Sequence, residues 1–240
     1  MEFSKKDVQK GLILPRSITL ELAYLIGVFV GDGSINVRLS KKEYLIKCVG
    51  NPRDEKELYN GVVGPLFKKV FGFIPDIRLK DSNTTYGFVV YSKSLVSYLT
   101  NVIGLPIGQK YDKLSVLPSI TSNDKFIVSF LRGLFDTDGC ITFKKRYRDY
   151  PYYPVISFSS KSKTLVKEVS HILNSYGFNI VEYYDYKVKD KRIIKGFTII
   201  NRVELNGKDN LELWMKTIGF LSPKHIAKIE KYGKNSGRRI

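Results

Sequence analysis

The fold is decided by a segment that occurs twice, first as Leu22-Ala-Tyr-Leu-Ile-Gly-Val-Phe-Val-Gly-Asp-Gly-Ser-Ile35 and then as Phe130-Leu-Arg-Gly-Leu-Phe-Asp-Thr-Asp-Gly-Cys-Ile141. An offset of 106 residues aligns Asp32-Gly33 with Asp138-Gly139. Three further landmarks align in the same order: Phe71-Gly72-Phe73 with Tyr176-Gly177-Phe178, Gly87-Phe88 with Gly196-Phe197, and Val102-Ile103-Gly104-Leu105 with Thr217-Ile218-Gly219-Phe220. The chain is therefore predicted to be a tandem duplication of one domain-sized unit.

Each half is predicted to fold as an αββαββα unit, because helical and alternating apolar patterns follow one another in the same order. In the first half we expect helices at 17–31, 54–70 and 93–103, with strands at 35–39, 44–49, 77–80 and 86–91. In the second half we expect helices at 126–137, 162–176 and 210–218, with strands at 141–144, 153–159, 181–187 and 193–200. Ser17 and Ser122 are the predicted caps of the first helix in each half. Residues 104–121 form a linker, so the predicted domains are 1–121 and 122–240.

The charge of the chain indicates a polyanionic partner. Among 240 residues, 40 Lys and Arg oppose 23 Asp and Glu, which gives a formal charge of +17. The basic residues are spread along the whole chain rather than gathered in one amphipathic helix, which favours nucleic acid over a membrane surface. The N-terminus lacks a secretory apolar region, and Leu22 to Val30 is too short to cross a bilayer. We therefore expect a protein that stays inside the cell, in cytoplasm, nucleoid or an organelle, without a membrane partner.

The few cysteines and histidines argue against several chemistries. Cys48 and Cys140 are the only cysteines, and His171 and His225 the only histidines. Neither pair has the spacing of a zinc site or a disulfide framework. A nuclease site built on histidine is likewise disfavoured.

The first helix of each half carries a stripe of small residues. Ala23, Gly27 and Gly31 recur every four residues in one helix, and Ser129, Gly133 and Thr137 stand at the equivalent positions of the other. Glycine inside a helix costs about 1 kcal/mol relative to alanine, so matched stripes favour two helices packed closely on each other. Their C-terminal ends would then bring Asp32 and Asp138 together.

A cation is the expected partner of these aspartates. A carboxylate at a helix C-terminus faces the negative end of the macrodipole, and two close carboxylates repel each other. Their hard oxygen atoms suit magnesium or calcium. Asp-Gly after a single helix is more often an ordinary turn, but two copies in register favour a functional site. Asp136 aligns with Val30, so we expect it to have a structural role.

The two copies resemble the paired motifs of the LAGLIDADG homing endonucleases, in their single-chain, intron-encoded form. The resemblance spans about residues 17–232. It implies an α+β protein with two pseudo-twofold-related units, each a curved antiparallel four-stranded sheet with helices on one face, which together form a DNA-binding saddle. It also implies a monomer that cleaves both DNA strands of a long recognition site across the minor groove and leaves short 3′ overhangs.

The resemblance also implies roles for individual residues. Metal would be bound by Asp32 and Asp138, assisted by the carbonyls of Gly31 and Thr137. Polar residues at the second strand's end, and a lysine before the last segment of each unit, would take part in catalysis; these are Asn51, Ser160, Lys110 and Lys224. The two lysines have an equally weighted alternative as ordinary solvated side chains. Mg²⁺ is the expected ion, with Mn²⁺ able to replace it and Ca²⁺ supporting binding with poor cleavage.

The polar faces of the strands are the predicted DNA-binding surface. Alternation with apolar residues is expected to turn these side chains away from the core, although alternation alone shows only exposure. The predicted major-groove residues are Asn36, Arg38, Ser40, Lys47, Arg78, Lys80, Thr142, Lys144, Lys187 and Lys189, and the hairpin loop adds Lys145, Arg146 and Arg148 for phosphate contacts.

A different class of function stays open from the sequence. A catalytically inactive relative, acting as an RNA maturase or a DNA-binding regulator, would keep the charge and lose the metal ligands. Both aspartates are present, which favours an active nuclease. We expect no intein, because the chain begins with Met1 and ends in Arg238-Arg239-Ile240 without a terminal Asn.

Overall fold

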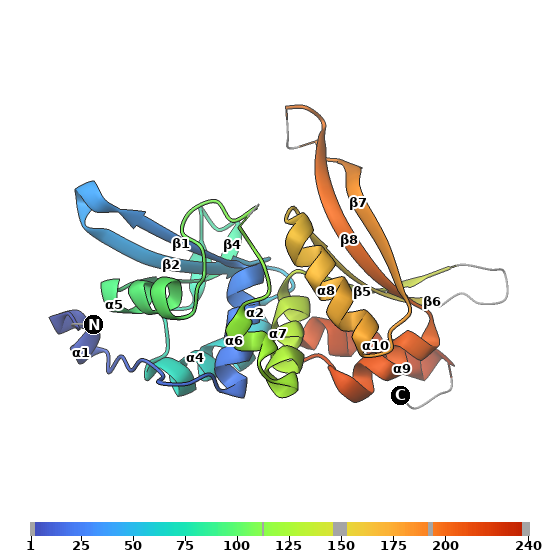
Figure 1. Cartoon of the computed structure of the whole chain (residues 1–240), viewed down its shortest axis with the longest axis horizontal. Helices are drawn as coiled ribbons and strands as arrows, with labels where there is room; N and C mark the ends of the chain where they lie inside the picture. Colours follow the sequence, from blue (N-terminus) through green and yellow to red (C-terminus); the bar gives the residue numbers. More distant parts are fainter. Residues whose placement is uncertain (1–2, 112, 146–152, 192–193, 237–240) are drawn as a thin grey trace. The chain divides into compact units, whose positions relative to one another are not determined.

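The chain forms two compact units in the computed structural model, which describes residues 3–111, 113–145, 153–191 and 194–236 (Figure 1). The first unit contains Met1–Lys110, Leu117–Thr137 and Leu221–Lys224; the second contains Tyr111–Val116, Asp138–Phe220 and His225–Ile240. These units differ from the predicted sequence domains, because the first helix of the second repeat packs in the first unit.

The first unit is a four-stranded antiparallel sheet with helices, and its sheet order is β1-β2-β4-β3. Its strands are β1 (Gly33–Arg38), β2 (Glu43–Gly50), β3 (Arg78–Lys80) and β4 (Thr85–Tyr91). Its helices are α1 (Lys5–Gln9), α2 (Leu20–Gly31), α3 (Lys56–Leu58), α4 (Gly64–Phe71), α5 (Lys93–Ser97), α6 (Pro118–Thr121) and α7 (Asp124–Thr137), with π-helical segments η2 (Tyr59–Val63) and η3 (Tyr98–Val102) and a short 3₁₀ turn η1 (Leu39–Lys41). Residues 56–71 are thus helical throughout, as predicted.

Helices α2 and α7 pack side by side, backbone against backbone (Figure 1). A Cβ added at Gly27 would lie 2.2 Å from the carbonyl oxygen of Phe130, and one added at Gly133 would lie 2.1 Å from that of Tyr24. Ser129 Oγ donates to the carbonyl of Leu20 at 2.7 Å, so the contacts advance by four residues along both helices together. The helices therefore run in the same direction, and the predicted packing of the small-residue stripes is confirmed.

The predicted caps of these helices are wrong by one or two residues. Thr19, not Ser17, caps α2, and its side chain accepts from the amide of Leu22. At α7 the Asn123 side chain accepts from the amide of Lys125, which places the helix start after Asn123 rather than at Ser122. In both cases another residue with a short polar side chain lies closer to the first helical turn.

The second unit repeats the architecture, with sheet order β5-β6-β8-β7. Its strands are β5 (Gly139–Lys144), β6 (Tyr153–Ser160), β7 (Ile180–Lys189) and β8 (Phe197–Asn206), and its helices include α8 (Lys163–Ser175) and α9 (Lys208–Thr217). A further helix, α10 (Pro223–Ser236), was not predicted. The order α2-β1-β2-α3/α4-β3-β4-α5 matches α7-β5-β6-α8-β7-β8-α9, so the predicted αββαββα fold class is confirmed.

One predicted landmark of the repeat is wrong. Gly87 in β4 pairs with Val49 in β2, and the equivalent pair in the second unit is Arg202 in β8 with Ser159 in β6. Arg202, and not Gly196, therefore corresponds to Gly87. Gly196-Phe197 lies instead at the start of β8, because the β7–β8 hairpin is longer than β3–β4. The landmarks at Gly72 with Gly177 and at Gly104 with Gly219 hold, since all four glycines have positive φ angles. Within the described ranges, no helix combines the length and apolar character needed to cross a bilayer.

Candidate functional site

Asp32 stands at the junction between α2 and β1. It is the C-terminal cap of α2, and β1 begins at the next residue. A Cβ at Gly33 would lie 2.5 Å from the carbonyl of Phe29, so only glycine lets the strand leave the helix this abruptly. The Asp32 carboxylate accepts a hydrogen bond of 2.8 Å from the hydroxyl of Tyr59. The Asp-Gly pair of the motif therefore fixes a carboxylate at the end of the helix.

A second carboxylate, Glu55, lies beside Asp32. A Cβ at Gly50 would lie 1.8 Å from Glu55 Oε2 and 2.8 Å from Asp32 Oδ2, so both oxygens face the same backbone point. Glu55 Oε2 accepts from the amide of Asn51 at 2.6 Å, and Glu55 Oε1 is bonded to the ammonium of Lys224. Sequence reasoning missed Glu55, because an acidic residue before a helix is an ordinary feature.

Lys110 occupies the C-terminal end of α2. Its Nζ donates to the carbonyl of Val30 at 2.7 Å and to that of Gly31 at 2.5 Å. Helix carbonyls without intrahelical partners attract cations, and here the cation is an ammonium group. The carbonyl of Gly31, predicted to assist a metal, thus already faces a positive charge. Lys110 and Lys224 are both half-buried against this site, and their catalytic roles stay predictions.

Tyr59 and Cys48 are the buried residues beneath Asp32, and neither was predicted to contribute to the site. Both are fully buried, and Cys48 Sγ lies 3.5 Å from the hydroxyl of Tyr59. Burial raises the pKa of Tyr59 well above its ordinary value, and the charge of Asp32 acts in the same direction. The hydroxyl therefore stays protonated and donates to Asp32.

Asp138 follows α7 directly, as Asp32 follows α2, but its repeat offers different neighbours. Strand pairing of Gly33 with Cys48 and of Gly139 with Phe158 shows that Phe158 stands where Cys48 does. Ser162 precedes α8 as Glu55 precedes α3. The Thr137 side chain donates to the carbonyls of Gly133 and Leu134 within α7.

The predicted pairing of Asn51 with Ser160 is shifted by one residue. Counting from Cys48 and Phe158, Ser160 matches Gly50, and Asn51 matches Lys161. The Asn51 side chain accepts from the amide of Arg53, and Ser160 Oγ accepts from the amide of Ser162. The strand of the first repeat ends at Gly50, which leaves Asn51 in the turn. Catalytic roles for Asn51 and Ser160 stay predictions.

Asp136 has the structural surroundings that its alignment with Val30 predicts. It is fully buried, accepts from the Tyr24 hydroxyl at 2.8 Å, and accepts from the amides of Leu221 and Ser222 at 3.0 Å each. Burial raises its pKa to about 6, although these hydrogen bonds act in the opposite direction. The residue ties α2, α7 and the segment before α10 together.

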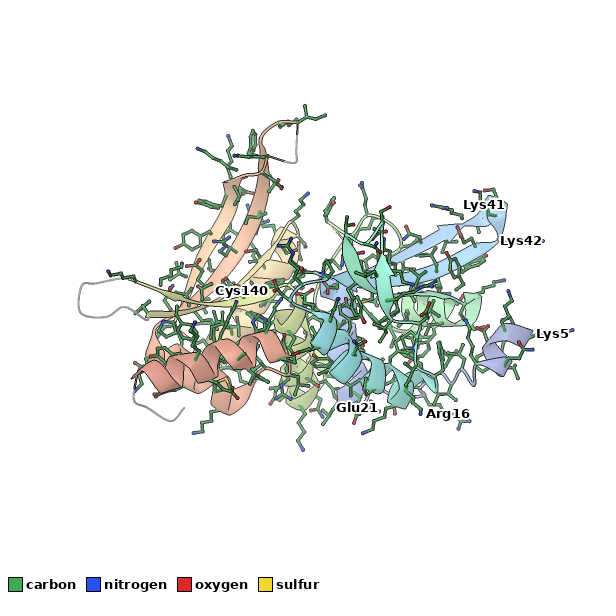
Figure 2. The ribbon with its side chains drawn as sticks, turned by 180° about the vertical axis from the view of Figure 1, so that it is seen from behind. Lys5, Arg16, Glu21, Lys41, Lys42 and Cys140 are labelled. Carbon is green, nitrogen blue, oxygen red and sulfur yellow. The ribbon has the colours of Figure 1, made fainter. Side chains whose placement is uncertain are left out.

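The sheet of the first unit carries the predicted polar and basic residues on the face opposite the core. Ile35, Ile46 and Phe88 are buried, and cross-strand partners share a face. Asn36, Arg38, Lys47, Arg78 and Lys80 all lie on the other face by this register. Ser40 is exposed in η1. Lys41 and Lys42, which were not predicted, extend the basic surface to the end of the β1–β2 hairpin (Figure 2).

In the second unit the face assignment holds for Thr142 and Lys144 and is wrong for Lys187 and Lys189. Ile141 and Ile156 are buried core residues, so Thr142 and Lys144 lie opposite the core. The register of β7 shifts between Tyr183 and Tyr186, where Asp185 has a φ of 53°. This bulge inserts one residue and turns Lys187 and Lys189 to the other face, with Ile199 and Phe197. Tyr183 and Tyr186 take their place opposite the core. Lys145 is exposed, whereas Arg146 and Arg148 lie outside the described residues.

In the part of the chain that the structure describes, no three His, Cys, Asp or Glu side chains gather as a ready-made metal site.

Comparison with known proteins finds a family model that matches the second repeat. Residues 125–219 match the model of the LAGLIDADG-like domain. The chain is 26% identical over 216 residues to a glutamine–fructose-6-phosphate aminotransferase of Methanocaldococcus jannaschii, and 27% identical over 183 residues to an uncharacterized protein of the same organism. It spans only 18% and 60% of the length of these two relatives, while 90% and 73% of the chain are matched.

Solved structures with the same fold are homing endonucleases bound to DNA. One is I-DmoI in complex with DNA and Ca, with a TM-score of 0.57 and 20% identity, covering 88% of this chain and 97% of that one. Another is I-WcaI bound to its DNA recognition sequence, with a TM-score of 0.55 and 15% identity, covering 94% and 92%. Residues 125–219 therefore match a LAGLIDADG-like domain, and the chain as a whole has the two-unit fold of these solved homing endonucleases.

Proposed function

We propose that this chain is a site-specific, divalent-metal-dependent DNA endonuclease that cuts both strands of a long recognition site and leaves short 3′ overhangs. The observation that carries the proposal is the packing of α2 against α7, since each helix ends directly before an aspartate. Such helices hold their carboxylates on rigid elements, which a catalytic site requires.

The residues around Asp32 fit a hard cation. The Asp32 carboxylate and the carbonyls of Val30 and Gly31 form a group of oxygen atoms at the negative end of α2, and this group already holds the ammonium of Lys110. Mg²⁺ is the proposed ion, Mn²⁺ replaces it, and Ca²⁺ supports binding with poor cleavage. When bound, the ion supplies Lewis-acid activation of a phosphodiester and of water.

The chain's own residues would complete the chemistry. Asp32 and Asp138 would each serve as the carboxylate ligand, with Gly31 and Thr137 offering backbone carbonyls. The Tyr59 hydroxyl fixes the orientation of Asp32 through its 2.8 Å hydrogen bond. Lys110 and Lys224 would stabilise negative charge that develops on the phosphoryl oxygens.

DNA is the proposed partner because the chain is strongly basic and its sheet faces carry that charge. With a formal charge of +17, binding should weaken with salt by a slope of about −0.9 per phosphate contact. In the free protein, Arg38, Lys47 and Arg78 pair with acidic neighbours, at 3.2, 2.6 and 2.9 Å. The backbone phosphates would compete for these bases. Both repeats are in one chain, so we propose that the protein acts as a monomer with an internal pseudo-dyad.

We do not infer the activities named for the longer relatives for this chain. An aminotransferase and a replication factor C small subunit of the same organism have unlike names, and the chain spans 18% of one and 10% of the other. The matched region is a small part of both relatives. This supports the view that the region is a separate module, whose activity differs from the activities that the two names describe.

The test is selection of cut sites from a random double-stranded DNA library in Mg²⁺, with sequencing of the cut ends. The proposal expects one long consensus with 3′ overhangs for the wild type and none for an Asp32→Asn, Asp138→Asn double variant that still binds the consensus. Binding without cutting by the wild type in Mg²⁺ or Mn²⁺ would favour the inactive regulator or maturase instead.

A further inference from the structure

We propose that Glu55 is a positioning residue that holds the ammonium of Lys224 beside Asp32, so that cutting of one DNA strand depends on Glu55 and cutting of the other does not. This inference rests on the proposed nuclease function.

Both oxygens of Glu55 are engaged, which fixes the orientation of its carboxylate. Oε1 is bonded to Lys224 and Oε2 accepts from the amide of Asn51 at 2.6 Å. The side chains of Glu55 and Lys224 are 6% and 21% exposed, so solvent screens the pair only weakly. Loss of one partner would leave a mostly buried charge without compensation. Lys224 is therefore held in one place by Glu55.

That place is next to the Asp32 carboxylate. Glu55 Oε2 and Asp32 Oδ2 both face the backbone of Gly50, where a Cβ would lie 1.8 and 2.8 Å from them. Two carboxylates this close repel each other, and the ammonium of Lys224 offsets the repulsion. The ammonium of Lys110 is bonded to the carbonyls at the end of α2, whereas Glu55 is bonded to Lys224. Glu55 thus selects Lys224 as the cation of this carboxylate pair.

The second repeat lacks this arrangement. Ser162 takes the place of Glu55 before α8, where its hydroxyl accepts from the amide of Leu165 at 3.2 Å and donates to the carbonyl of Leu114 at 2.8 Å. A serine used as a helix cap carries no charge and cannot anchor an ammonium. Val166 likewise takes the place of Tyr59, since each donates its amide to the residue before its helix. The dependence on Glu55 is therefore confined to one of the two aspartates.

The chemical consequence concerns charge in the transition state. An ammonium held in place stabilises developing negative charge on a phosphoryl oxygen better than a mobile one, because no reorganisation is needed. Glu55 acts through Lys224 and touches no reacting atom in this scheme.

A double-mutant cycle on the full chain tests this role. Single-turnover cutting of each strand of a supercoiled plasmid carrying the selected site is measured at saturating protein, for wild type, Glu55→Gln, Lys224→Met and the double variant. Glu55→Gln should slow one strand about 10- to 100-fold, so that nicked plasmid accumulates. Lys224→Met should slow the same strand, and the double variant should match Lys224→Met within about threefold.

Glu21→Gln is the matched control. Glu21 pairs with Lys69 at 2.6 Å in the same unit. It lies in the first turn of α2, at the opposite end of the helix from Asp32, so its loss should change neither strand's rate by more than about twofold. Thermal melting and DNA binding in Ca²⁺ show that each variant is folded.

Three results would overturn the inference. They are equal slowing of both strands by Glu55→Gln, multiplicative losses in the double variant, and a Glu55→Gln variant that cuts like the wild type. In each of these the wild type still cuts, so the proposed function stands. Failure of the wild type to cut any selected site would overturn both together.

Discussion

The two repeats surround their aspartates with different chemistry on the same backbone. In the first repeat, Cys48, Glu55 and Tyr59 form a polar cluster with Asp32. In the second, the register and helix starts give the same places to Phe158, Ser162 and Val166. Duplication therefore preserved the helix and strand geometry that carries the carboxylates, while the side chains that tune them diverged.

The difference teaches that the backbone symmetry of the two repeats is separable from the side-chain chemistry around Asp32 and Asp138. Gly27 and Gly133 play matching roles at the α2–α7 contact. A Cβ added at either glycine would lie 2.2 or 2.1 Å from a backbone carbonyl oxygen of the other helix. The places of Cys48, Glu55 and Tyr59 are instead taken by other residue types in the second repeat. Substitutions in the two repeats can therefore separate the features common to both from those confined to one.

The largest expected effect is on cleavage. Asp32→Asn and Asp138→Asn should each slow DNA cutting about 1000-fold, about 4 kcal/mol, because each removes a carboxylate ligand of the proposed cation. Affinity for the site in Ca²⁺ should change less than about tenfold, because the sheet faces supply it. Plasmid cleavage at saturating protein, with binding measured in parallel, checks this. Wild-type cutting by either variant would remove that aspartate from the site.

The next largest effect is expected on stability, at the contact between α2 and α7 to which both repeats contribute a glycine. Gly27→Ala and Gly133→Ala should each lower the free energy of unfolding by about 3 kcal/mol, because the added methyl group meets backbone atoms that cannot move away cheaply. Gly61→Ala is the control, since nothing lies within 4 Å of its Cβ position, and it should be neutral or slightly stabilising. Urea unfolding gives the values. Equal effects at Gly27 and Gly61 would contradict the close helix packing.

Asp136 provides a test confined to the second copy of the motif. Asp136→Asn should cost about 2 kcal/mol of stability at pH 4, because the amide NH2 replaces one of the two oxygens that accept from Tyr24, Leu221 and Ser222. Cutting of DNA should be affected less than stability. A variant that unfolds like the wild type but fails to cut would give Asp136 a catalytic role.

The pKa of Asp136 adds a pH dependence. Burial raises it from 3.8 to about 6, so the folded state holds this proton more tightly than the unfolded state. The resulting stability is fully present below pH 3.8 and is lost as pH rises through about 6, which amounts to about 3 kcal/mol. The stability of wild type relative to Asp136→Asn should therefore fall from pH 4 to pH 7. A difference that is constant with pH would show that Asp136 is not buried as described.

The smallest effects concern DNA recognition by the two sheets. Arg78→Ala should relax base preference at one position by about 1 to 3 kcal/mol, because an arginine on this face can hold a guanine edge. Lys187→Ala should leave base preference unchanged, since the bulge turns Lys187 away from that face. Binding-site selection with each variant decides between them. A change of preference with Lys187→Ala would contradict the register of β7.

The repeated motif made most of the fold predictable. Asp-Gly after each helix, alternating strands and small-residue stripes are local or periodic features, which a sequence displays directly. The caps at Thr19 and Asn123 were missed because several short polar residues stand next to each other there. The bulge at Asp185 was missed because one inserted residue leaves alternation intact on both sides and reverses the faces beyond it.

The candidate site was predictable only where the motif repeats. Asp32 and Asp138 share a register, and Lys110 and Lys224 came from the resemblance to a family. Glu55 and Tyr59 could not be recognised by comparing the repeats, because Ser162 and Val166 take their places and the residue types do not recur. Their contact with Asp32 crosses 23 and 27 residues of chain and depends on tertiary packing.

The most direct test of the account is strand-resolved, single-turnover cutting of one selected DNA duplex by the wild-type chain in Mg²⁺, Ca²⁺ and EDTA. We predict that both strands are cut in Mg²⁺ at different rates, and that both stay intact in EDTA and nearly so in Ca²⁺. Failure to cut in Mg²⁺ a duplex that the protein binds specifically, or cutting that persists in EDTA, would contradict the assignment of Asp32 and Asp138 as carboxylates of a metal-dependent nuclease.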